Sequence, residues 1–145
     1  MTYNLHETED WAPLAVLFHD AGLEVEPGDP APRKLVKMWR VDDEEGKLLG
    51  AITLVHRGGA YALGELAVSE DARDGGCGEM LMEAVYDEVR ALGGTEVWTC
   101  ARIPKYYANH GWEVMDPEEA PKISNCQYCE RFRTVCFPEI LRMTV

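Results

Sequence analysis

The stretch from Leu66 to Leu81 constrains the fold more than any other part of the chain. Its sequence, L-A-V-S-E-D-A-R-D-G-G-C-G-E-M-L, leads from an apolar run through a polar, glycine-rich turn into a helical pattern. It therefore predicts a strand, a turn over 73–78 and the N-terminus of a helix. The first N–H groups of a helix lack partners within it, and the helix dipole favours negative charge there. Because glycine lets a ligand approach the backbone closely, the turn is a predicted anion-binding loop.

The spacing of the glycines narrows the kind of loop. Arg73, Gly76 and Gly78 read R-x-x-G-x-G, which is neither the dinucleotide fingerprint nor the P-loop. An ordinary strand–turn–helix connection also uses glycine, so the spacing alone leaves both interpretations open. The run resembles motif A of the GNAT N-acyltransferase superfamily, in which this loop wraps the pyrophosphate of acetyl-coenzyme A. The resemblance implies that backbone groups of the strand pair with pantetheine and that the turn binds pyrophosphate, through Leu66, Ala67, Val68, Arg73, Asp74, Gly75, Gly76, Cys77 and Gly78.

The apolar periodicity of the whole chain predicts an α+β protein. Strands are expected at 3–7, 34–41, 47–56, 61–68, 96–100, 112–115 and 140–145, and helices at 11–21, 77–92 and 104–110. Asp10 is the expected N-cap of the first helix. The helical crossover places strand 96–100 parallel to the strand that ends at Val68. The expected architecture is one mixed, mostly antiparallel sheet of six to seven strands flanked by helices, in a single domain of residues 1–145.

One face of the helix over 77–92 is expected to be buried. The apolar residues on that face are Cys77, Leu81, Ala84, Val85, Val89 and Leu92.

A second segment strengthens the resemblance. K-Y-Y-A-N-H-G-W, from Lys105 to Trp112, is similar to the family's motif B, F-Y-x-x-x-G-F, with Tyr107 at the tyrosine position four residues before Gly111. The order of elements is also similar to a GNAT domain over nearly the whole chain, with two parallel central strands that splay apart to admit pantetheine. The resemblance implies that Tyr107 protonates the leaving thiolate while an acetyl group passes directly to a primary amine of a small molecule or amino acid. A backbone N–H of the Leu66–Val68 strand would stabilise the oxyanion.

The general base stays open among three alternatives. The family's glutamate position is occupied by Ala62, and the nearby Glu65 is expected on the opposite strand face because side chains alternate. Glu65 is therefore a candidate base or a structural or pantetheine-side carboxylate. His56 is a second candidate, since the usual pKa of histidine suits the task. A water chain without a dedicated base is the third.

Charge and targeting signals limit the partners. The net charge is −12, from 26 acidic and 14 basic residues, which argues against a nucleic acid or an anionic membrane as partner and is compatible with a cationic amine substrate. We find neither a signal-peptide pattern nor an apolar run long enough for a membrane span. Five cysteines without an export signal indicate a reduced, cytoplasmic setting. The resemblance leaves a homodimer open.

The C-terminal cysteines are the least settled part of the sequence. Cys126, Cys129 and Cys136 read C-x2-C-x6-C, in a tail similar to that of small GNAT proteins described as N-acetylglutamate-synthase-like. The cysteines could begin a zinc site, form a redox pair or pack as reduced thiols, and we predict no metal. An amino-acid substrate would need a cation for its carboxylate, for which candidates are Arg57, Arg102 and Lys105.

A rival function keeps the fold but loses catalysis. Asp74 and Glu79 place negative charge beside the predicted phosphate loop, and Ala62 lacks the family's carboxylate. With the cysteine tail, these departures are compatible with a coenzyme-A-binding or thiol- or metal-sensing module.

Overall fold

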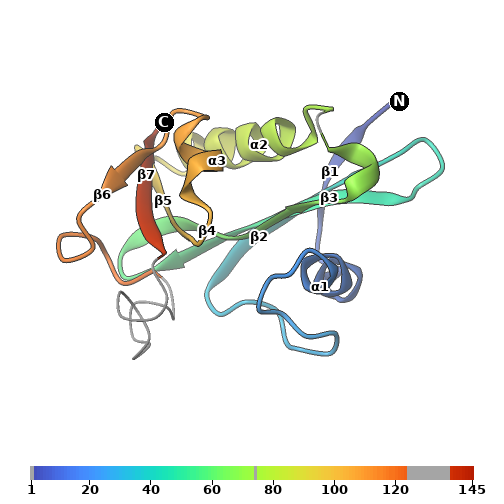
Figure 1. The fold of residues 1–145 in the computed structure, drawn as a ribbon, viewed down its shortest axis with the longest axis horizontal. Coiled ribbons are helices and arrows are strands. Elements are labelled where there is room, and N and C mark those ends of the chain that lie inside the picture. Colours follow the sequence, from blue (N-terminus) through green and yellow to red (C-terminus); the bar gives the residue numbers. More distant parts are fainter. Residues whose placement is uncertain (1, 74, 124–137) are drawn as a thin grey trace. The chain divides into compact units, whose positions relative to one another are not determined.

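The computed structural model describes residues 2–73, 75–123 and 138–145. Within them the elements are β1 (Asn4–Thr8), α1 (Trp11–Asp20), β2 (Leu35–Asp42), β3 (Leu48–Arg57), β4 (Ala60–Val68), the short 3-10 helix η1 (Glu70–Ala72), α2 (Cys77–Ala91), β5 (Glu96–Ala101), α3 (Pro104–Ala108), β6 (Glu113–Met115) and β7 (Glu139–Thr144) (Figure 1). The strands form one sheet in the order β1-β2-β3-β4-β5-β7-β6. The predicted order of elements and the mixed sheet of an α+β protein are confirmed.

The chain divides into two compact units. The first comprises Met1–Val55 with Leu63–Asp87, and the second comprises His56–Ala62 with Glu88–Val145. The division passes through β3, β4 and α2, so both units contain parts of these elements. The single-domain organisation expected from the sequence stays a prediction.

In the first unit, helices cover both faces of the strands (Figure 1). On one face α1 packs into an apolar cluster of Leu14, Ala15, Phe18, Val25, Met38, Ala51 and Ala67. On the other face α2 approaches β3 so closely that a β-carbon on Gly50 would lie 2.8 Å from Cys77 Sγ and 3.2 Å from Leu81 Cδ1. Since real side chains do not tolerate 2.8 Å, the close packing of α2 on β3 depends on glycine at position 50.

A tight turn joins β3 to β4. Gly58 and Gly59 both have positive φ, +58° and +80°, which a two-residue type I′ turn requires and which glycine adopts without strain. Such a short connection joins only antiparallel strands. The antiparallel meander predicted over β2, β3 and β4 therefore forms, and its second hairpin leads the chain directly into β4.

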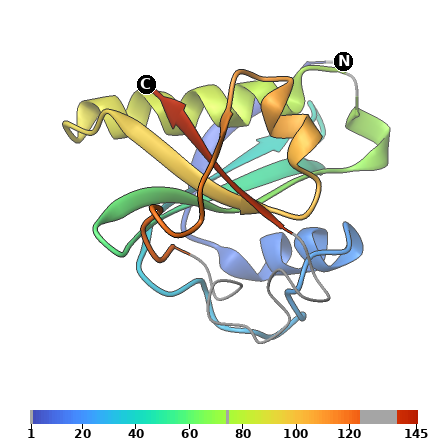
Figure 2. The same cartoon turned by 60° about the vertical axis from the view of Figure 1, so that its left-hand side comes forward.

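In the second unit, the C-terminal strand lies inside the sheet. β7 pairs antiparallel with β5 from Glu96↔Thr144 to Ala101↔Glu139 and with β6 on its other edge (Figure 2). β4 and β5 pair in parallel at Ala62↔Trp98, as the helical crossover predicts. Splaying of the two strands beyond this pair stays a prediction.

One detail of the sequence interpretation needs correction. Leu92 does not belong to the buried face of α2, because the helix ends at Ala91 and the Leu92 side chain is 48% exposed. Asp10 is the N-cap residue of α1, as predicted, although its side chain makes no capping hydrogen bond. The cysteine tail at 126–136 lies outside the described residues.

Candidate active site

The predicted anion loop joins β4 to α2 in the first unit. The N–H of Ser69 donates to the carbonyl of Leu49 at 2.7 Å, which ends the pairing of β4, and η1 then turns the chain toward the helix. Leu66 and Val68 are half-buried, whereas Ala67 is buried against the α1 cluster. Arg73, Gly75 and Gly76 are exposed in the loop. Asp74 lies outside the described residues.

A glycine with left-handed backbone geometry directly precedes α2. Gly76 has φ +84°, and its carbonyl accepts the N–H of Met80 at 3.1 Å. The first N–H groups of a helix have no carbonyl one turn earlier within the helix, and in α2 these groups start at Cys77. Among the described residues beyond its chain neighbours, the atom nearest to a β-carbon placed on Gly76 is Glu79 Oε2, at 4.0 Å. The loop therefore presents helix-end donors beside open space, as binding of a phosphate group requires.

Glycine at position 75 has a different reason. A β-carbon there would collide with the hydroxyl group of Tyr3, just before β1. The loop thus packs against the N-terminal segment of the chain. The sequence analysis missed Tyr3, since nothing in the spacing of the glycines points to a residue 72 positions earlier.

The thiol of Cys77 points away from the loop. The side chain is 1% exposed and lies against Gly50 of β3. Burial, with a smaller contribution from the Glu79 carboxylate, raises the pKa of the Cys77 thiol to about 11. Although a helix N-terminus normally favours a thiolate, the cost of desolvation outweighs it here. Cys77 can therefore offer a ligand only its backbone N–H.

A carboxylate lies over the loop. Glu79 is exposed in the first turn of α2, and its Oε2 is the atom 4.0 Å from the β-carbon position of Gly76. Such a carboxylate suits the positive end of the helix dipole, but it repels a second anion. Glu79, one of the two acidic residues noted beside the loop in the sequence, therefore lies close to Gly76 in the structure.

The strand before the loop is irregular at Glu65. Thr53 Oγ1 of β3 lies 2.6 Å from Glu65 Oε2 and accepts the Glu65 N–H at 2.8 Å. A β-carbon on Gly64 would collide with the same Thr53 oxygen. Gly64 and Glu65, two consecutive residues of β4, thus both lie against Thr53 of β3. In a β-bulge, two residues of one strand likewise oppose one residue of its partner.

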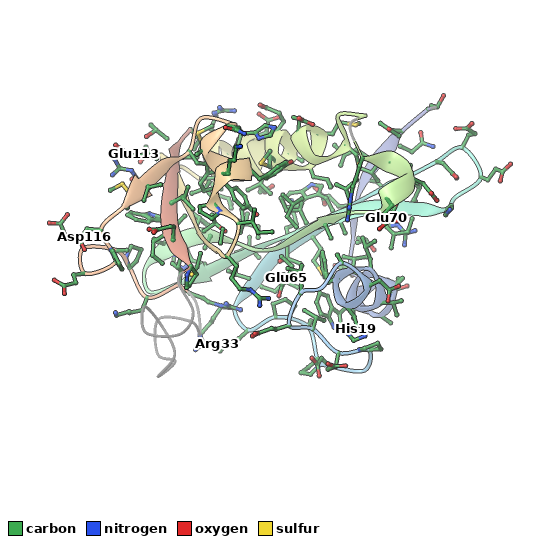
Figure 3. The ribbon with its side chains drawn as sticks, viewed as in Figure 1. His19, Arg33, Glu65, Glu70, Glu113 and Asp116 are labelled. Atoms are coloured by element: carbon green, nitrogen blue, oxygen red, sulfur yellow. The ribbon has the colours of Figure 1, made fainter. Side chains whose placement is uncertain are left out.

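The contacts with Thr53 place the Glu65 carboxylate within the first unit. Strict alternation would put Gly64 and Glu65 on opposite faces of β4, but the β-carbon position of Gly64 and the Glu65 carboxylate both lie against Thr53 Oγ1. Thr53 is the strand partner of Met38, a member of the α1 cluster, so the Glu65 carboxylate lies on the α1 side of β3 and β4 (Figure 3). The expected placement of Glu65 and Ala62 on opposite faces stays a prediction, because Ala62 belongs to the second unit.

The motif B segment belongs to the second unit. Tyr107 lies in α3 and is half-buried, with its ring edge-on to Trp112 at 5.4 Å between ring centroids. The Tyr107 carbonyl accepts the N–H groups of His110 and Trp112 at 2.9 and 3.1 Å. These bonds fix the turn that follows α3. His56, the alternative base, is exposed and packs edge-on against Tyr61 at 4.8 Å.

The three candidate carboxylate-binding cations lie in the second unit. Arg57 is half-buried and donates to the Ile123 carbonyl at 3.3 Å, whereas Arg102 and Lys105 are exposed. Among the described residues, no group of three or more His, Cys, Asp and Glu side chains is placed to hold a metal ion. In the same part of the chain, every helix is too short or too polar to cross a membrane.

The fold, with its glycine loop at the start of α2, defines a class of acyltransferase. The family model of the acetyltransferase (GNAT) domain matches residues 35–114, and the chain belongs to this family of enzymes. A comparison with curated protein sequences found no significant match.

Solved structures share the fold at low sequence identity. The chain is similar to N-acetylglutamate synthase from Neisseria gonorrhoeae, crystallised with coenzyme A and N-acetyl-glutamate, at TM-score 0.74 and 19% identity over 99% of this chain and 35% of that one. It is similar to a GNAT acetyltransferase from Staphylococcus aureus at TM-score 0.73 and 12% identity over 99% of each chain. It is also similar to a Mycobacterium tuberculosis protein in complex with coenzyme A, at TM-score 0.70 and 11% identity over 100% and 99%. This chain thus spans about a third of the synthase.

Proposed function

We propose that this chain transfers an acetyl group from acetyl-coenzyme A to a primary amine of a small molecule or amino acid. The observation that carries the proposal is the loop at the start of α2, where Gly76 leaves open space beside helix-end N–H donors. Acetyl-coenzyme A supplies the activated thioester, and its pyrophosphate has the charge and size that such donors bind. Membership of the GNAT family supports the same donor.

The proposed reaction needs one proton acceptor and one proton donor. The neutral amine attacks the thioester carbonyl, the carbon–sulfur bond breaks, and the coenzyme A thiolate leaves. We assign Glu65 to take the proton that the amine loses, because its carboxylate is on the α1 face beside a hydrogen-bond donor. We assign Tyr107 to protonate the thiolate, on its place in motif B. A backbone N–H of Leu66–Val68 stabilises the oxyanion.

The acceptor is proposed only as a class. The N-acetylglutamate synthase of N. gonorrhoeae was crystallised with N-acetyl-glutamate, so glutamate is a reasonable first acceptor to test here. A net charge of −12 suits attraction of a cationic amine. The cytoplasmic location and the homodimer stay predictions.

Calorimetric titration with acetyl-coenzyme A tests the donor site. We expect the reduced wild-type protein to bind with a Kd on the order of micromolar. Gly76→Asp should abolish binding, because it adds a charge and a strained side chain to the loop. Gly28→Asp is the matched control, since Gly28 also has positive φ (+99°) and open surroundings but lies in the loop after α1. Equal loss in both variants, or no binding by the wild type, would refute the site.

Turnover separates the enzyme from its rival, a coenzyme-A-binding or sensing module without catalysis. With acetyl-coenzyme A and a panel of amines that starts with amino acids, the enzyme releases free thiol and the rival does not. Tyr107→Phe should lower kcat by about 10²-fold at unchanged acetyl-coenzyme A affinity. Binding without turnover of any amine would favour the rival.

A further inference from the structure

We propose that Thr53 is a positioning residue that holds the Glu65 carboxylate in the orientation in which it receives the proton of the amine. This inference rests on the proposed function, in which Glu65 is the base. Thr53 lies on β3, outside both GNAT motifs, and the sequence gives no reason to connect it with catalysis. The inference comes from the contacts of a single buried hydroxyl group.

The hydrogen bonds of that hydroxyl have a defined direction. The Glu65 N–H can only donate, so at 2.8 Å it uses Thr53 Oγ1 as its acceptor. The single proton of the hydroxyl is then directed at Glu65 Oε2, 2.6 Å away. The short second distance is typical of a hydroxyl that donates to an ionised carboxylate. One hydroxyl therefore binds the backbone and the side chain of the same residue and fixes their relative orientation.

Burial makes this arrangement rigid. Thr53 is completely buried, although it carries a polar group, and Thr99 is another buried threonine. It is held in register between Met38 on β2 and the bulge on β4. A buried hydroxyl without partners would be costly, so the pair of bonds to Glu65 is the state that the surroundings enforce.

Gly64 completes the arrangement from the other strand. Any β-carbon at position 64 would collide with Thr53 Oγ1. Glycine in the bulge thus leaves the space in which the hydroxyl meets the carboxylate. Thr53 and Gly64 are two independent points at which the same geometry can be disturbed.

Thr53 should affect catalysis through the orientation of the Glu65 carboxylate. The terminal torsion of a glutamate side chain normally varies over a broad range. Because the threonine hydroxyl holds Oε2, rotation of the Glu65 carboxylate about this bond is restricted. A proton acceptor that is already oriented gains rate because it need not be ordered in the transition state. Loss of the hydroxyl should therefore lower kcat and leave the binding of acetyl-coenzyme A unchanged.

Three variants test the proposal by steady-state kinetics. Thr53→Val removes the hydroxyl at nearly constant volume, Thr53→Ser keeps it, and Gly64→Ala displaces it. We expect Thr53→Val and Gly64→Ala to lower kcat by about tenfold with the KM for acetyl-coenzyme A within about twofold, and Thr53→Ser to stay within about threefold of wild type. Thr99→Val, which removes the hydroxyl of another buried threonine, is the control for a loss of stability alone. Equal loss in Thr53→Ser and Thr53→Val would overturn the proposal.

A second measurement does not depend on turnover. In protein labelled with carbon-13 at the glutamate side-chain carboxyl, the Glu65 resonance is assigned with Glu65→Gln. It should move in Thr53→Val and return in Thr53→Ser. An unchanged resonance in Thr53→Val would overturn the proposal even in an active enzyme. If Glu65→Gln retains wild-type kcat, it is the assignment of Glu65 as base that fails, whereas absence of turnover by the wild type refutes the enzymatic function itself.

Discussion

Replacement of Glu79 by glutamine is expected to tighten the binding of coenzyme A. Glu79 is exposed in the first turn of α2, and its Oε2 lies 4.0 Å from the β-carbon position of Gly76, over the proposed phosphate loop. A bound pyrophosphate would bring further negative charge close to this carboxylate. Glutamine keeps the size and the hydrogen-bonding ability of the side chain but removes the charge.

The size of the effect follows from Coulomb's law. Two unit charges about 8 Å apart, at an effective dielectric constant of about 40 for an exposed site, repel by about 1 kcal/mol. Relief of about 1 kcal/mol lowers Kd about fivefold. Because the site is exposed, salt should reduce the gain, and little of it should remain at about 1 M ionic strength, where the screening length is about 3 Å.

Calorimetric titration of coenzyme A at low and high salt measures this effect. Glu83→Gln is the matched control, because Glu83 is also exposed on α2 but lies one turn farther from the loop. It removes the same charge at a distance where repulsion is weaker. An equal gain in both variants would mean that net charge, not the position of Glu79, governs binding. A gain that persists unchanged at high salt, or no gain at all, would refute the electrostatic argument.

Three further predictions concern the fold and its thiol. Cys77 should react with iodoacetamide at pH 8 only after unfolding, as peptide mass spectrometry would show, because burial raises its pKa to about 11. Phe18→Ala should lower the free energy of unfolding, measured with urea, by about 3–5 kcal/mol, because the Phe18 ring is fully buried in the apolar cluster in which α1 packs. Burial raises the pKa of Asp42, but hydrogen bonds from His6 and Arg40 outweigh it and leave the pKa below its usual value. The Asp42 carboxylate therefore stabilises the folded protein at pH values above its unfolded-state pKa, and this stabilisation is lost as the pH falls through its lowered folded-state pKa. Asp42→Asn should therefore melt earlier than wild type at about pH 6 and lose that difference toward about pH 3, as calorimetry would show.

The local elements were predictable from the sequence because each has a local cause. The spacing of Leu14 and Phe18 defines the buried side of α1, and the glycine pair 58–59 specifies a hairpin. The place of β7 was not predictable. Its apolar pattern says that it is a strand, but not that it lies between β5 and β6, because strand pairing is decided by packing between distant segments.

The candidate site also contains some features that were predictable from the sequence and others that were not. Gly76 and the helix start were predicted, since a glycine loop before a helical pattern has a local meaning. Tyr3 was missed because its contact with Gly75 joins segments far apart in sequence. The irregularity at Gly64 and Glu65 was missed because alternation assumes a regular strand, and only the contacts with Thr53 reveal the departure from it.

The proposed donor loop and the proposed base should respond differently to mutation. The donor loop offers backbone N–H groups, so substitutions there act through φ, space and charge, and Cys77 is replaceable by any apolar residue that fits against Gly50. The proposed base depends instead on side chains, Thr53 and Glu65, set in register by a bulge. A residue inserted into or removed from β4 between Ala62 and Leu66 would turn the carboxylate to the other face and leave the loop intact. Such a change should therefore preserve binding of acetyl-coenzyme A and abolish its turnover.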